Sequence, residues 1–71
     1  MQVFVRHEED TSSTLICDCE YDEIELVVGN FVRGGGIYVP HRNRIYTNLS
    51  YQYVLDRGNA YCDIILHEEE S

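Results

Sequence analysis

Hydrophobic and polar residues alternate over several short stretches of this chain, and a period of two is typical of half-buried β-strands. The alternation is clear over residues 3–5, 14–21, 51–55 and 60–67. A polar cluster at residues 8–13 separates the first two stretches and has the composition of a loop. The sequence therefore predicts that the first two strands form an antiparallel hairpin.

The end of the chain predicts a second hairpin. The segment Asp56-Arg57-Gly58-Asn59 favours a tight turn, because Gly58 adopts positive φ at no steric cost. In each long strand, every second residue should then share a face. In the strand at residues 60–67, this face is predicted to hold Ala60, Cys62, Ile64 and Leu66. In the strand at residues 14–21, it is predicted to hold Leu15, Cys17, Cys19 and Tyr21.

Residues 22–31 fit either a strand or a short helix. Ile24, Leu26 and Val28 alternate as in a strand, with Glu23 and Glu25 outward. A helical stripe can equally be drawn through Ile24, Val27, Val28 and Phe31. In the helical interpretation, Asp22 would cap the N-terminus. The β-branched Val27-Val28 pair and Gly29-Asn30 disfavour a long helix, so we favour the strand.

The middle of the chain predicts short strands between breaks. Gly34–Gly36 predicts a flexible break, and residues 37–39 a strand that Pro40 ends. The polar residues 41–44 connect to strand residues at 45–47. The fold class predicted is thus mainly β, a small antiparallel sheet folded as a barrel or sandwich, with α+β as the alternative if 22–31 is helical. We expect a single small domain over residues 1–71, whose last residues, 68–71, form a frayed acidic tail.

Charge is divided unevenly along the chain. The net charge of −8 comes from 13 acids and five basic residues, all five arginine. Eight of the acids lie in residues 1–25 and five in residues 56–71, whereas residues 26–55 hold none and carry three arginines. Such a division can give a folded surface with one strongly negative region. The net charge of −8 disfavours direct binding of nucleic acid, because phosphates would be repelled.

Composition limits the cellular location and the type of activity that we expect. No apolar run approaches the roughly 18 residues that a membrane span needs, and residues 1–6 do not resemble a signal peptide. We therefore expect a cytoplasmic protein whose three cysteines are reduced. No nucleophile motif or glycine-framed serine is present, so we expect no enzymatic activity.

Two clusters of residues offer chemistry that the sequence does not decide. The cysteines are weak candidates for a metal site, because two thiols at i and i+2 can face one ion, but small buried hydrophobic residues are the simpler interpretation. The weak metal candidates are Cys17, Cys19, Cys62 and His67. Arginine forks, tyrosine rings and three successive glycines in the middle segment could bind a phosphate or nucleotide. This alternative ligand site comprises Arg33, Tyr38, Arg42, Arg44 and Tyr46.

The acids of the first 25 residues form the favoured candidate site. On a strand, alternate carboxylates point outward at about 7 Å spacing and would attract a basic surface. The predicted acidic face comprises Glu8, Glu9, Asp10, Asp18, Glu20, Glu23 and Glu25. In its size and acidity the chain resembles small phage-encoded inhibitors of host defence, such as anti-CRISPR and DNA-mimic proteins. The resemblance is one of physical type and transfers no residue roles.

We therefore expect a non-enzymatic acidic interaction module, without a cofactor, that docks on a basic host protein or nucleoprotein complex. Two alternatives remain open: a nucleotide or phosphate binder acting through the Arg33–Arg44 segment, and a structural subunit of a homo-oligomer. A homodimer is expected in any case, because a core this small leaves strand edges to cover.

Overall fold

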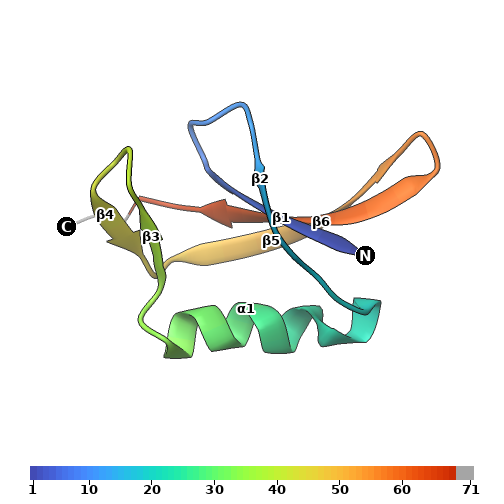
Figure 1. Cartoon of the computed structure of the whole chain (residues 1–71), viewed down its shortest axis with the longest axis horizontal. Helices are drawn as coiled ribbons and strands as arrows, with labels where there is room; N and C mark the ends of the chain where they lie inside the picture. The colour runs from blue at the N-terminus through green and yellow to red at the C-terminus, as the bar shows by residue number, and fades with distance from the viewer. Residues whose placement is uncertain (69–71) are drawn as a thin grey trace.

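A computed structural model of the chain describes residues 1–68 as a curved sheet with one helix beneath it (Figure 1). The elements, in chain order, are β1 (Gln2–His7), β2 (Thr14–Asp18), the 3-10 turn η1 (Tyr21–Glu23), α1 (Ile24–Arg33), β3 (Ile37–Val39), β4 (Arg44–Tyr46), β5 (Leu49–Asp56) and β6 (Asn59–Leu66). The prediction of a mainly β fold, with a helix as the α+β alternative, is confirmed.

The main sheet is four-stranded and mixed, in the order β2-β1-β6-β5, and β3 and β4 form a separate two-stranded hairpin. The two predicted hairpins are present as antiparallel pairs, β1 with β2 and β5 with β6. The sheet is not wholly antiparallel, however, because β6 pairs in parallel with β1. A parallel pair needs a long connection, which α1 and the β3–β4 hairpin provide here. Within residues 1–68 the sheet does not close into a barrel.

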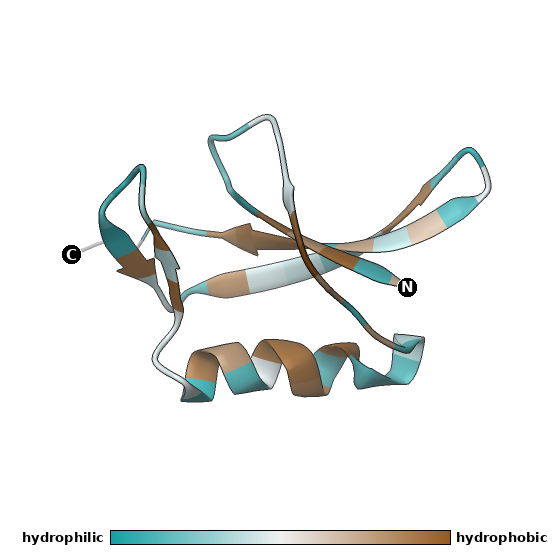
Figure 2. Cartoon of the chain, viewed as in Figure 1, coloured by the Kyte–Doolittle hydropathy of each residue, from teal (hydrophilic) through white to brown (hydrophobic). Residues whose placement is uncertain are grey.

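The favoured strand at 22–31 is wrong, and a helix covers residues 24–33 instead. Glu20 and Glu23 form a capping box, which satisfies backbone N–H groups where the helical segment starts. Ile24 is fully buried in the core, and Val28 and Phe31 pack against that core. Figure 2 shows the hydrophobic residues of α1 beneath the sheet. Burial of this stripe outweighs the modest helix propensity of the valine pair.

A bulge changes the predicted face of β2. Val3 pairs with Cys17, whereas Phe4 pairs with Leu15, so Ile16 is an extra residue on β2. Because Val3 and Phe4 point to opposite faces of β1, Cys17 and Leu15 do so as well. The prediction that Leu15, Cys17, Cys19 and Tyr21 share one face is therefore wrong. Leu15 lies on the face opposite α1.

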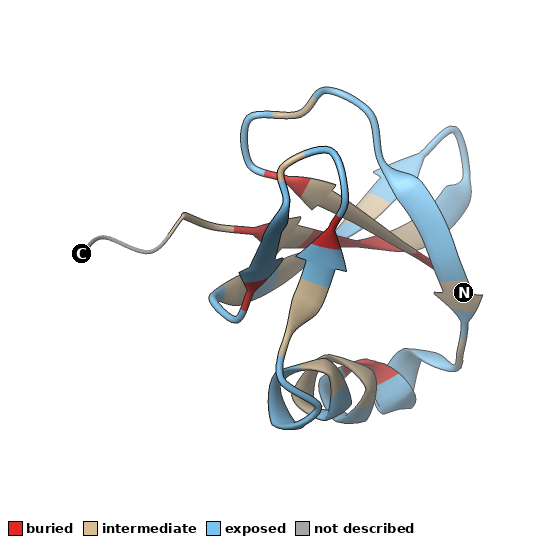
Figure 3. Ribbon diagram, turned by 60° about the vertical axis from the view of Figure 1, so that its left-hand side comes forward, coloured by how far each residue is buried: buried red, intermediate tan, exposed pale blue. Residues whose placement is uncertain are grey.

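The second hairpin matches its prediction closely. Cys62, Ile64 and Leu66 are each at most 1% exposed and form the core with Val3 and Ile24 (Figure 3). The turn places both central residues at positive φ, 52° at Arg57 and 84° at Gly58, as a type I′ hairpin requires.

The three glycines after α1 form an ordered turn rather than the predicted flexible break. The backbone N–H of Gly34 donates to the carbonyl of Asn30 at 2.9 Å, and that of Gly36 donates to the carbonyl of Phe31 at 2.8 Å. These bonds use carbonyls that the helix end would otherwise leave without partners.

Within residues 1–68, α1 spans ten residues, and no helix has the length and apolarity needed to cross a membrane.

Candidate functional site

The predicted acidic face divides into two groups in the folded chain. Glu8, Glu9 and Asp10 lie in the β1–β2 loop above the sheet, whereas η1 and the start of α1 lie below it (Figure 1). The sheet lies between the loop and the helical segment. Cations neutralise part of the first group, so the two must be considered separately.

In the loop group, Asp10 has two basic partners. Its carboxylate accepts hydrogen bonds from Arg42 Nη2 at 3.0 Å and His41 Nε2 at 3.2 Å. The bond from Arg42, helped by that from His41, lowers the pKa of Asp10. Glu8 Oε2 lies 2.6 Å from His67 Nδ1. These two carboxylates therefore hold the loop to neighbouring elements, and Arg42 lies among the acids rather than apart from them.

In the second group, three carboxylates have structural roles. Asp18 Oδ1 lies 3.0 Å from the Met1 ammonium group, and this contact raises the pKa of that ammonium. Glu20 and Glu23 form the capping box, in which the Glu20 N–H donates to Glu23 Oε1 at 3.0 Å. Glu20, Glu23 and Glu25 lie after the end of β2, so the expected row at strand spacing does not exist.

Two more acids lie in the helical segment: Glu25 belongs to the predicted acidic face, and Asp22 was not predicted as part of it. Asp22 and Glu25 are exposed, and neither forms an ion pair with another residue of the described part of the chain. They lie at the N-terminal end of the helical segment, where carboxylates are favoured by the helix dipole.

A stacked pair of tyrosines adjoins these two acids. The rings of Tyr21 and Tyr53 have centroids 4.7 Å apart at an interplanar angle of 27°, yet they remain 66% and 45% exposed. Desolvation raises the pKa of Tyr53, and the nearby Glu25 carboxylate adds to the rise. The stack thus joins η1 to the edge strand β5. We name Tyr21, Asp22, Glu25 and Tyr53 the acidic–aromatic patch.

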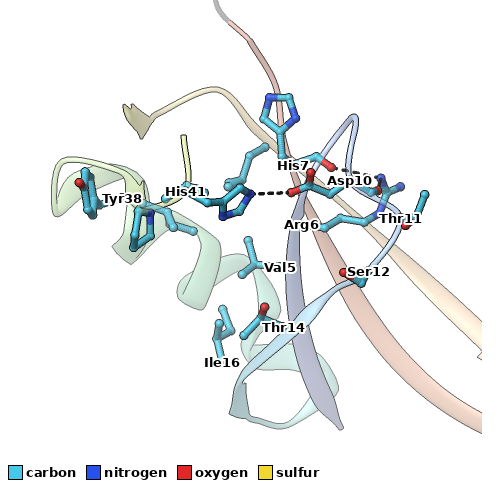
Figure 4. Close-up of a pocket in the computed structure, with 14 residues that line it drawn as sticks. Val5, Arg6, His7, Asp10, Thr11, Ser12, Thr14, Ile16, Tyr38 and His41 are labelled. Carbon is cyan, nitrogen blue, oxygen red and sulfur yellow. Dashed lines mark hydrogen bonds and ion pairs between the residues drawn. The ribbon is translucent and has the colours of Figure 1, made fainter. Parts of the chain in front are cut away.

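A groove of about 480 Å³ separates the β1–β2 pair from the β3–β4 hairpin (Figure 4). Val5 and Ile16 line one side, and Ile37 and Val39 line the other. Asp10 contacts the hairpin through His41 and Arg42. Figure 4 shows the contact between Asp10 and His41. The groove was not predicted, because it depends on where the hairpin packs and not on any local pattern.

Two members of the alternative ligand site hold Glu68. Tyr46 O–H donates to Glu68 Oε1 at 2.8 Å, and Arg44 Nη1 donates to Oε2 at 2.6 Å. His7 is 1% exposed and accepts from the Glu9 N–H at Nδ1, so its Nε2 carries the proton that is donated to Glu68 Oε1. The bonds from Tyr46 and His7 lower the pKa of Glu68. Glu68 is therefore held in place, contrary to the predicted frayed tail; residues 69–71 lie outside the described part.

The other members of that site also have partners within the protein. Arg33 Nη2 donates to Asn30 Oδ1 at 2.6 Å, and Tyr38 O–H donates to Asn43 Oδ1 at 2.9 Å. Tyr46 is only 2% exposed, so its ring is not available to stack on a base. Arg42 is engaged by Asp10. Arg33, Tyr38 and Arg44 nevertheless stay exposed, so a phosphate or nucleotide site at residues 33–46 stays a prediction, without the Tyr46 ring as a stacking surface.

The cysteines lie apart from the histidine proposed to join them. Cys17 and Cys19 are half-buried and Cys62 is buried, all as free thiols, and desolvation raises the pKa of Cys19 and of Cys62. Cys62 lies in β6 and His67 directly follows that strand, an odd number of residues away, so their side chains point to opposite sheet faces. Within residues 1–68, no group of three or more metal-ligating side chains is close enough to hold an ion.

His67 instead contacts Ser50, which the sequence analysis did not single out. Ser50 Oγ lies 2.6 Å from His67 Nε2. The predicted turn at residues 56–59 fixes the register of the two strands, but the predicted strand began at Tyr51, so the pairing of Ser50 with Ile65, two residues before His67, was missed. Comparisons of the chain with protein-family models, curated proteins and solved structures gave no match.

Proposed function

We propose that the protein is a docking module that binds a basic protein surface through the acidic–aromatic patch. The observation that supports this is the exposed Tyr21–Tyr53 stack beside two carboxylates that no arginine neutralises in residues 1–68. Exposed aromatic residues are unusually frequent among the residues that dominate binding energy at protein interfaces.

The chemistry of the patch favours arginine on the partner. A guanidinium can lie over a tyrosine ring and at the same time bond a carboxylate. Glu25 follows Tyr21 by four residues in the helical segment, where side chains at this spacing are neighbours, so one arginine could meet both groups. Longer-range attraction from the net charge of −8 would speed encounter with such a surface and would weaken with added salt.

A basic surface of this kind is common on proteins that bind nucleic acid. A module docked there would compete with phosphates, and inhibition of a host defence or nucleic-acid-binding protein by a phage-type inhibitor is one function that this binding would serve. We place the protein in the cytoplasm, a proposal supported by its three unpaired thiols.

The test uses capture from a host lysate, followed by affinity measurement with the captured basic protein. Tyr21→Ala should weaken binding at least about 30-fold, the loss typical of a residue that dominates an interface. Asp22→Asn with Glu25→Gln should weaken binding and reduce its salt dependence. These acids are preferable to Glu20 and Glu23, whose substitution would also disturb the capping box.

Matched controls are available elsewhere on the surface. Tyr38 is 54% exposed on β3, and Glu9 is exposed in the β1–β2 loop. Tyr38→Ala and Glu9→Gln should bind as the wild type does. If the control variants lose as much affinity as the patch variants, or if the patch variants bind normally, the proposed docking surface is wrong.

We also propose that the protein forms a homodimer, supported by the exposed edge of β2. This strand pairs only with β1 and presents Leu15 at 51% and Ile16 at 36% exposure. Light scattering at high protein concentration should give twice the monomer mass, and Leu15→Glu should restore the monomer. A monomer at all concentrations would exclude the dimer.

A further inference from the structure

A serine on β5, the histidine that directly follows β6 and a glutamate in the β1–β2 loop lie in line. Ser50 Oγ lies 2.6 Å from His67 Nε2, and His67 Nδ1 lies 2.6 Å from Glu8 Oε2. A carboxylate only accepts, so Nδ1 must donate to Glu8. In neutral His67 this leaves Nε2 as the acceptor for the Ser50 hydroxyl. The order is that of a nucleophile, a general base and the group that orients the base.

Backbone hydrogen bonds fix the positions of all three residues. Ser50 pairs with Ile65 in the β5–β6 ladder. The His67 N–H donates to the Asn48 carbonyl at 2.9 Å, and the Glu8 N–H donates to the Leu66 carbonyl at 2.9 Å. The three hydrogen-bonded side chains are therefore held by the sheet and by the residues that directly follow its strands, which suits a site that needs fixed geometry.

An acyl group has room beside Ser50. The residue is exposed, and the side chains of His67 and Glu8 are 32% and 38% exposed. By its pairing with Ile65, Ser50 lies on the sheet face opposite the buried Ile64, and Val54 shares that face. The helix α1 packs on the other face, as its contact with the core shows.

We propose that Ser50 is an activated nucleophile for small carboxylic esters, with His67 as general base and Glu8 as the positioning residue. Ser50 Oγ forms a bond to the acyl carbon while His67 Nε2 takes the hydroxyl proton. The ester C–O bond breaks, and the leaving alcohol takes that proton. Water then attacks the acyl-serine with His67 again as base, which releases the acid and restores Ser50. This activity goes beyond the docking function and departs from the expectation of a protein without catalysis.

The decisive test is a fluorophosphonate probe, which needs the nucleophile but no specific pocket. Ser50 Oγ displaces fluoride from phosphorus, and peptide mass mapping then locates the label. We expect the label on Ser50 in the wild type, its loss in Ser50→Ala and its loss or strong slowing in His67→Gln. Ser12→Ala removes another exposed serine and should leave labelling unchanged.

Hydrolysis of p-nitrophenyl acetate gives the second measurement. General-base assistance is worth on the order of 10² in rate, so Ser50→Ala should remove most of the activity. Glu8→Gln should lower the acylation rate and change its pH profile while leaving KM unaltered, which a loss of folding would not produce. Circular dichroism checks that each variant is folded.

Either of two results overturns the proposal. One is a folded wild type in which the probe leaves Ser50 unlabelled, a result that depends on no variant. The other is labelling or hydrolysis that persists at the wild-type rate in folded His67→Gln.

Discussion

Alanine at Gly36 should destabilise the protein strongly, because the turn after α1 approaches β4 too closely for a side chain. A Cβ atom on Gly36 would lie 2.4 Å from the Tyr46 carbonyl oxygen and 2.9 Å from Thr47 Cγ2. Its φ of +101° also belongs to a region that residues other than glycine rarely adopt. The backbone contact cannot be relieved by rotation of a side chain, so the turn or β4 must move.

The expected cost follows from two unfavourable effects and one favourable one. Strained φ costs about 2 kcal/mol, and forcing a methyl group into occupied space costs about 2 kcal/mol more. Reduced freedom of the unfolded chain returns about 0.7 kcal/mol. Gly36→Ala should therefore lower the free energy of unfolding by about 3 kcal/mol. In a domain of this size that lowers Tm by roughly 15 °C.

Gly35→Ala is the matched control. Gly35 has nearly the same φ, +100°, but a Cβ there would have no neighbour within 4 Å. It should cost only the strain less the gain from the unfolded chain, about 1 kcal/mol. Urea unfolding followed by circular dichroism measures both variants. Equal losses in the two variants, or a Gly36→Ala protein as stable as the wild type, would refute the close approach to β4.

Three further predictions follow from the core and the titratable groups. Ile24→Ala should lower the free energy of unfolding by about 3 kcal/mol in urea titration, because Ile24 is fully buried between α1 and the sheet; a loss below 1 kcal/mol would show that the helix contributes little. The pKa of Glu68 is lowered in the folded state, so its bonds should stabilise the protein above pH 4.5, with that stability lost as pH falls through the folded pKa. Glu68→Gln should therefore flatten the acidic limb of a stability–pH curve, and an unchanged limb would contradict this. Because desolvation raises the pKa of Cys19 and of Cys62, a disulfide reagent should modify both far more slowly in the native protein than in urea, and comparable rates would show that these thiols are accessible.

Local patterns predicted those parts of the fold that local physics decides. The β5–β6 hairpin could be predicted because alternation over 60–66 and the Arg57-Gly58 turn agree on one register. The parallel pairing of β1 with β6 joins the two ends of the chain, and no short-range pattern encodes it. The bulge at Ile16 likewise depends on how β2 meets β1, so the faces of Leu15 and Cys17 were mispredicted.

In the helix and the candidate site, too, local patterns could be predicted but contacts between distant residues could not. At residues 22–31 the periodicities of a strand and of a helix were both present, and the need to cover the core around Ile64 decided between them. The acids remain predicted partner-binding residues, but their neighbours in the fold could not be foreseen. Asp10 meets Arg42, 32 residues away, whereas Glu25 has no such partner in residues 1–68.

The most direct test of the docking proposal is a map of where an arginine-rich peptide binds. Isotope-labelled protein is titrated with the peptide, and backbone amide shifts are followed by NMR at low salt. The proposal predicts saturable shifts concentrated at Tyr21, Asp22, Glu25 and Tyr53, which are lost in Tyr21→Ala. Shifts centred on the β1–β2 loop, or spread evenly over all acidic residues, would contradict it.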